Sequence, residues 1–162
     1  MGKYWICKRA AVFVNEAQEC LGGAGYVEES MLPRLYRQAP LNSIWEGSGN
    51  IQCLDVLRAL SREAQALPVL DAELAGVAGR DPVYDAALQS LRVVLAATPT
   101  EAQARRVTEQ VALLLQAAAL LRADSPNAAA FIRSRLGGEH AMAFGTLPDG
   151  LDLAAVLVRA LP

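Results

Sequence analysis

The sequence predicts an all-α fold, and three features indicate it. Hydrophobic residues make up 53% of the 162 positions, and in several segments they recur at helical spacing. Proline and glycine interrupt these segments at intervals, at positions where helices begin and end. No stretch of the sequence alternates apolar and polar residues for long enough to indicate a sheet.

The first helix is predicted over residues 4–21. The pair Gly22-Gly23 follows it and supplies the positive φ that helix C-termini favour. Residues 24–47 are expected to be irregular, because Pro33 and Pro40 are helix breakers.

A second long helix is predicted over about residues 49–65, with Ser48 as a candidate N-cap. Apolar residues recur along it at helical spacing, which predicts one buried face. That face contains Ile51, Leu54, Val56 or Leu57, and Leu60.

Three later helices are predicted to start where a polar residue precedes proline, at Asp81-Pro82, Thr98-Pro99 and Ser125-Pro126. A short last helix is predicted over residues 151–160. The longest helix, residues 99–123, has a single apolar stripe that should face a core. The stripe consists of Val107, Val111, Leu114, Leu115, Ala118 and Leu121.

Charge divides the chain into two parts. Residues 1–62 hold seven Lys/Arg and six Asp/Glu, a net charge of +1, whereas residues 63–162 hold eight and eleven, a net charge of −3. We therefore expect two domains with a boundary near residue 62. The overall net charge of −2 does not indicate a nucleic-acid binder by bulk electrostatics.

The composition also bears on location and on metal binding. No apolar run reaches the length of a membrane span, and no secretory signal pattern is visible. Cys7, Cys20 and Cys53 form no CxxC pair, which suits reduced thiols in the cytoplasm, and we expect them to be small core residues. His140 is the only histidine, so no metal site is predicted.

Residues 40–50, PLNSIWEGSGN, form the most unusual stretch of the chain. Glu46 follows Trp45 and precedes several small residues just before a predicted helix. A carboxylate in such surroundings is a candidate general base for a carbon-bound proton, and small residues let a flat or phosphorylated ligand approach the backbone. The alternative is an ordinary helix start with an exposed glutamate before it.

Several motifs resemble the C-terminal domain of the acyl-CoA dehydrogenase family in order and spacing. They are Gly22–Tyr26, Arg34–Arg37, Ile44–Ser48 and Ile51-Gln52. Trp45 and Ser48 replace the Tyr and Thr of the general family motif and resemble its alkylation-response branch, as do Pro40-Leu41 and residues 54–58. Residues 63–162 suit the additional helical domain of that branch in length and helical character.

The resemblance implies that Glu46 is the base that takes the α-proton of an acyl-CoA, while a hydride passes from the β-carbon to FAD. Glu19 stands where the family usually has Gln near the cofactor. The implied FAD-binding residues are Gly22, Gly23, Trp45, Gly47, Ser48 and Asn50.

The resemblance covers only the C-terminal part of a family member, without its N-terminal helical domain and β-domain. We therefore expect a C-terminal fragment that neither retains FAD nor is active alone. We also expect it to form homo-oligomers, because the helices that cover its apolar faces in the bundle of a family member would be missing from the fragment.

The alkylation-response branch is also associated with DNA. Arg58 and Arg62 lie four residues apart on one helix face, so they are the candidate contacts to double-stranded DNA. The alternative is a solvated helix face on which arginines pair with glutamates. A non-catalytic helical module for oligomerisation or nucleic-acid contact is the alternative function for the whole chain.

Overall fold

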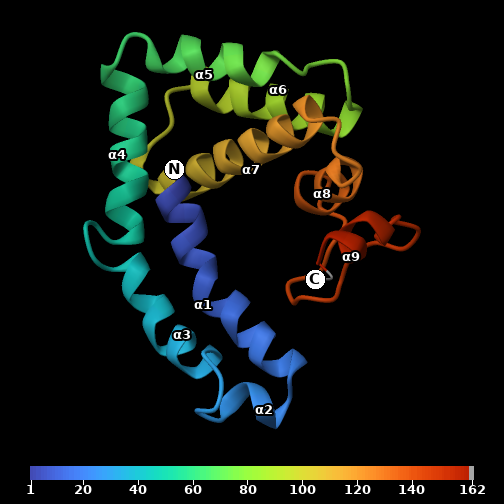
Figure 1. Ribbon diagram of the computed structural model, residues 1–162. Coiled ribbons are helices and arrows are strands. Elements are labelled where there is room, and N and C mark those ends of the chain that lie inside the picture. The colour runs from blue at the N-terminus through green and yellow to red at the C-terminus, as the bar shows by residue number, and fades with distance from the viewer. Residues whose placement is uncertain (161–162) are drawn as a thin grey trace. The chain divides into compact units, whose positions relative to one another are not determined.

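Helices make up all the regular secondary structure of residues 1–160, which the computed structural model describes, so the all-α prediction is confirmed (Figure 1). The elements in chain order are α1 (Gly2–Cys20), α2 (Gly23–Tyr26), α3 (Leu32–Gln38), η1 (Ala39–Ser43), α4 (Gly49–Arg62), α5 (Ala66–Ala75), α6 (Pro82–Ala96), η2 (Glu101–Gln103), α7 (Ala104–Arg122), α8 (Ala128–Arg135) and α9 (Ala154–Ala160).

The chain forms two compact units. The first unit contains Met1–Ala59 and Thr100–Glu109, and the second contains Leu60–Pro99 and the residues from Gln110 onward. Residues of α4 and of α7 therefore belong to both units. The expected pair of domains, residues 1–62 and 63–162, stays a prediction.

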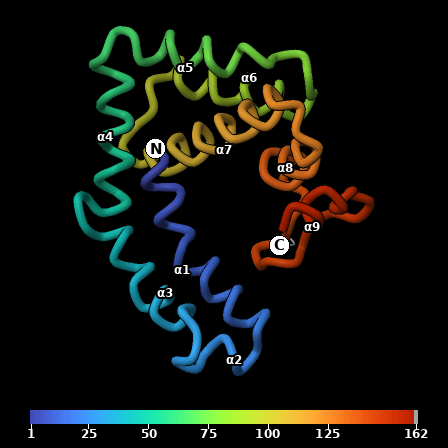
Figure 2. The backbone as a smooth tube through the Cα atoms, viewed as in Figure 1, coloured from blue at the N-terminus to red at the C-terminus, as the bar shows by residue number. Residues whose placement is uncertain are grey.

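In the first unit, α1 lies alongside α3 and η1, and α2 connects the far end of α1 to α3 (Figure 2). The core of this unit contains Tyr4 and Cys53, which are 7% and 0% exposed, together with Ala104. Leu54 and Leu57 of α4 pack against it. The predicted burial of Cys53 is thus confirmed.

The expectation that residues 24–47 are irregular was wrong for most of that range, since α3 and η1 lie within it and α2 overlaps its start. Pro33 and Pro40 each occupy the first turn of a helical element instead of ending one. Proline fits there because the first-turn N–H groups have no partner within the helix.

In the second unit, α5 and α6 lie side by side (Figures 1 and 2). Tyr84 of α6 is fully buried, and its hydroxyl donates to the Leu74 carbonyl of α5 at 2.8 Å. The predicted cap of α6 is confirmed, because the Asp81 carboxylate accepts the Val83 and Tyr84 amides at 2.8 and 3.0 Å.

The sequence interpretation missed α5 and extended α4 too far. The second long helix ends at Arg62, not near residue 65, and a new helix starts at Ala66. Pro68 is the third residue of α5, so it again lies in a first turn.

The apolar stripe of α7 is confirmed, since its members are buried apart from the half-buried Leu115. The stripe of α4 was wrong at Ile51, which is 50% exposed, because Cys53, Val56 and Leu60 are the residues that face inward. Cys20 is also exposed, contrary to prediction, because it ends α1 beside the exposed loop residues.

Across residues 1–160, each helix is either too short or too polar to span a bilayer.

Candidate functional site

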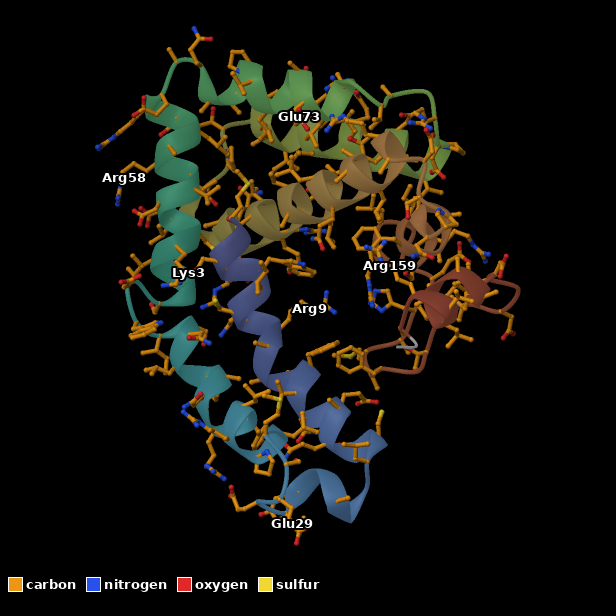
Figure 3. All side chains as sticks on the ribbon, viewed as in Figure 1. Lys3, Arg9, Glu29, Arg58, Glu73 and Arg159 are labelled. Carbon is orange, nitrogen blue, oxygen red and sulfur yellow. The ribbon has the colours of Figure 1, made fainter. Side chains whose placement is uncertain are left out.

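The loop from Ile44 to Ser48 joins η1 to α4 and carries Glu46. The Lys3 ammonium, from the start of α1, donates to the carbonyl of Trp45 and, at 3.1 Å, to that of Glu46 (Figure 3). The Gln52 side chain of α4 donates to the Gly47 carbonyl. Three successive loop carbonyls are thus bound by side chains of two different helices.

The backbone of Glu46 is left-handed, with φ of 52°. This conformation is unusual for a residue with a Cβ and costs on the order of 1–3 kcal/mol. Gly47 follows with φ of 95°, which glycine adopts without that cost. The Glu46 side chain is exposed to solvent.

The other predicted residues of this loop are also accessible. Trp45 is 55% exposed, and Ser48 is exposed at the start of α4. The Asn50 side-chain oxygen accepts from Arg105 Nε at 3.4 Å. The structure therefore brings the predicted residues from 45 to 50 together on one accessible loop and helix start.

Gly22 and Gly23 do not join this group. They follow α1 at its C-terminal end, whereas Lys3 holds the Glu46 loop at the N-terminal end. A helix of 19 residues spans about 28 Å. Within one chain, the two predicted cofactor-binding segments are therefore separated by nearly the length of α1.

The two predicted nucleic-acid contacts, Arg58 and Arg62, lie on α4 and are exposed. Arg58 projects outward (Figure 3) and forms an ion pair with Asp55 three residues earlier. The positive charge at Arg58 is therefore partly compensated within its own helix.

A hollow of about 300 Å³ on the first unit was missed from the sequence. It is lined by Tyr4, Trp5, Lys8, Arg9 and Glu109. The Arg9 guanidinium lies over the Trp5 ring at 4.6 Å from its centroid, an i,i+4 cation–π pair that the sequence spacing could have indicated. Glu46 does not line this hollow.

No cluster of three or more His, Cys, Asp or Glu side chains able to hold a metal occurs among residues 1–160.

Comparison with known proteins relates this sequence to a family. Residues 1–61 match the model of the acyl-CoA dehydrogenase C-terminal domain. AidB of Escherichia coli (strain K12), which carries the name acyl-CoA dehydrogenase, is 50% identical over 124 residues, or 76% of this chain. The chain belongs to the acyl-CoA dehydrogenase family.

Further relatives match shorter parts of the chain. Acyl-CoA dehydrogenase family member 11 of Caenorhabditis elegans is 45% identical over 65 residues, which is 40% of this chain and 10% of that protein. Cyclohexane-1-carbonyl-CoA dehydrogenase of Geobacter metallireducens is 34% identical over 64 residues, covering 40% of this chain and 17% of the relative. The match to AidB covers 23% of its length, so the chain corresponds to a minor part of each of these family members.

Proposed function

We propose that Glu46 is the catalytic base of an FAD-dependent acyl-CoA dehydrogenase-like protein of the alkylation-damage response type. Its carboxylate takes the α-proton of the acyl-CoA as a C=C bond forms between the α- and β-carbons. FAD, when bound, supplies the acceptor for the hydride that leaves the β-carbon.

The observation that carries this proposal is the left-handed backbone of Glu46. A glutamate held at φ of 52° by Lys3 is costly for stability, and such conformations cluster at functional sites. Thr98 and Asp124, which precede η2 and α8, also have a positive φ, so the conformation supports the proposal together with the exposed Trp45 beside Glu46.

The surrounding residues fit one wall of a flavin site. Gly47 and Ser48 are small, so a planar ring can approach the backbone, and Trp45 offers an exposed aromatic face. Asn50 adds an amide at the start of α4. These four residues would line the ring system of FAD.

Gly22 and Gly23 fit the other end of FAD, from a different subunit. A Cβ added at Gly23 would meet no atom within 4 Å, and its φ is not positive, so packing within this chain does not require glycine there. Glycine at this position is instead explained by the close approach of a ligand to the backbone. Because the length of α1 separates these glycines from Glu46 of the same chain, we expect them to contact the FAD that is bound at Glu46 of a neighbouring copy.

We expect this chain alone to bind FAD weakly, because Trp45 and Ser48 are exposed and supply only one wall. The first test is a titration of the purified chain with FAD, followed by flavin fluorescence. Absence of saturation at micromolar FAD agrees with the proposal. One tightly bound FAD per chain would contradict the expectation that the chain alone does not retain FAD, but not the role of Glu46.

The role of Glu46 is tested in a chimera, with residues 1–61 in place of the matching segment of E. coli AidB. Anaerobic addition of acyl-CoA should bleach the bound flavin, and Glu46→Gln should slow bleaching by about 100-fold or more. The exposed Glu29→Gln is the matched control. Equal rates for the two variants would exclude Glu46 as the base.

Double-stranded DNA is the second candidate ligand, through Arg58 and Arg62. The exposure of both guanidinium groups on α4 supports contact with phosphates, and the ion pair with Asp55 opposes it. Charge removal at both positions should weaken DNA binding and reduce its salt dependence. An unchanged salt dependence of a measured complex would rule out this surface.

A further inference from the structure

The second unit contains an apolar hollow of about 200 Å³ between α5 and α6. Its floor consists of leucines that are almost completely buried, and Leu67, 38% exposed, lies at its rim. The lining residues are Leu67, Leu70, Asp71, Leu74, Leu88, Leu91, Arg92, Leu95 and Ala96.

The polar part of this hollow is one ion pair. Arg92 Nε donates to Asp71 Oδ1 at 2.6 Å, and Nη2 donates to Oδ2 at 3.0 Å. Hydrogen bonding from Arg92 holds the pKa of Asp71 below its ordinary value, so the carboxylate is charged at neutral pH. The pair is therefore neutral as a whole, and a guanidinium still offers further N–H donors.

The size of the hollow restricts what can occupy it. An α-helix with side chains is about 10–12 Å wide and cannot enter 200 Å³. An engineered apolar cavity of about 150 Å³ holds benzene and stays free of water. The leucine floor gives water few hydrogen-bond partners, so filling the hollow with a small apolar group is favourable.

We propose that the hollow between α5 and α6 binds a small, neutral amphiphile: a short alkyl chain against the leucines, and an uncharged hydrogen-bonding head group at the Asp71–Arg92 pair. Charge complementarity selects the neutral head group. Asp71 already neutralises Arg92, and it would repel a ligand carboxylate. This site is separate from Glu46 and does not depend on the function proposed for it.

The direct test is a titration of the whole chain with 1-hexanol and with hexanoate, followed by the leucine methyl signals in NMR spectra. Saturable shifts confined to leucines of α5 and α6 are expected with 1-hexanol. Hexanoate should bind at least about tenfold more weakly. Absence of any saturable shift with 1-hexanol would overturn the proposal.

Variants separate this site from non-specific binding. Ala96→Phe places a ring into the hollow from an exposed rim position, without removing a core residue, and should abolish the 1-hexanol shifts. Ala86→Phe makes the same change at an exposed position of α6 that does not line the hollow, and binding should persist. Equal loss in both variants would overturn the site.

The role of the ion pair is tested by Asp71→Asn. This change removes the competing carboxylate and leaves the guanidinium, so hexanoate binding should tighten by about threefold or more while 1-hexanol binding stays unchanged. If Asp71→Asn left the ratio of the 1-hexanol and hexanoate affinities unchanged, the proposal that Asp71 selects a neutral head group would be wrong.

Discussion

At the scale of single residues, Glu46 combines an unfavourable backbone with an accessible carboxylate. The contact that holds it comes from Lys3, 43 positions earlier in the chain. Natural proteins retain such local strain where function needs it, at a cost in stability. A stability measurement can therefore show whether Glu46 is kept for a reason other than folding.

Replacement of Glu46 by glycine should stabilise the chain. Glycine adopts a φ near 52° without strain, and after the higher conformational entropy of glycine in the unfolded state is subtracted the net gain is about 0.5–1 kcal/mol. Glu46→Gln keeps the Cβ and should leave the free energy of unfolding unchanged. Urea unfolding followed by circular dichroism measures both, and a destabilised Glu46→Gly would show that the conformation is not strained.

The sequence was sufficient to select Glu46 but not to predict its conformation. Trp45 before it and the small residues after it are visible locally. The left-handed backbone depends on Lys3 and Gln52, and a hydrogen bond across 43 positions has no local signature. The sequence could not predict the exposure of Trp45 for the same reason, because its burial depends on which residues pack over the loop.

At the scale of secondary structure, the capped start of α6 was predictable, and the segments around Pro33 and Pro40 were not. Asp81 accepts two amides as its position before Pro82 predicted. Pro33 and Pro40 were interpreted as breakers, but each lies in a first turn, where its missing N–H costs nothing. The fold class was therefore right, while α3 and α5 were missed.

Tyr84 is a buried polar link between α5 and α6, in addition to the Asp71–Arg92 ion pair. Its buried hydroxyl donates to the Leu74 carbonyl at 2.8 Å. Tyr84→Phe should lower the free energy of unfolding at neutral pH by about 1 kcal/mol, because the carbonyl loses its donor. Tyr36→Phe, at a residue 41% exposed, is the control and should have little effect.

Tyr84 also predicts that the free energy of unfolding depends on pH in the alkaline range. Burial, with a smaller contribution from Asp85, raises the pKa of Tyr84 from 10.0 to about 12. The folded state thus binds the phenol proton more tightly than the unfolded state does. Its contribution is complete below pH 10.0 and is lost as the pH rises toward about 12. The stability difference between wild type and Tyr84→Phe should shrink across that window, and a constant difference would contradict this assignment.

At the scale of the whole molecule, exposed apolar side chains are unevenly distributed. Most of the large ones among the described residues lie within residues 1–51, including Ile6 and Phe13, which are 67% and 64% exposed. These two residues are seven apart on α1, so they share one helix face. Exposed apolar surface of this extent is typical of a surface that packs against protein.

We therefore expect the chain to self-associate through the face of α1 that carries Ile6 and Phe13. The double change Ile6→Glu with Phe13→Glu places two charges on that face and should shift sedimentation toward the monomer at equal protein concentration. Val93→Glu makes the same kind of change at a residue 60% exposed on α6 and should leave the oligomeric state unaltered. Circular dichroism establishes that all variants stay helical.

Because Gly22 and Gly23 are proposed to contact the FAD of a neighbouring copy, dissociation should also lower any residual affinity for FAD. A chain that is monomeric at all concentrations would contradict self-association through α1 and would require the partner of this face to be a different protein segment.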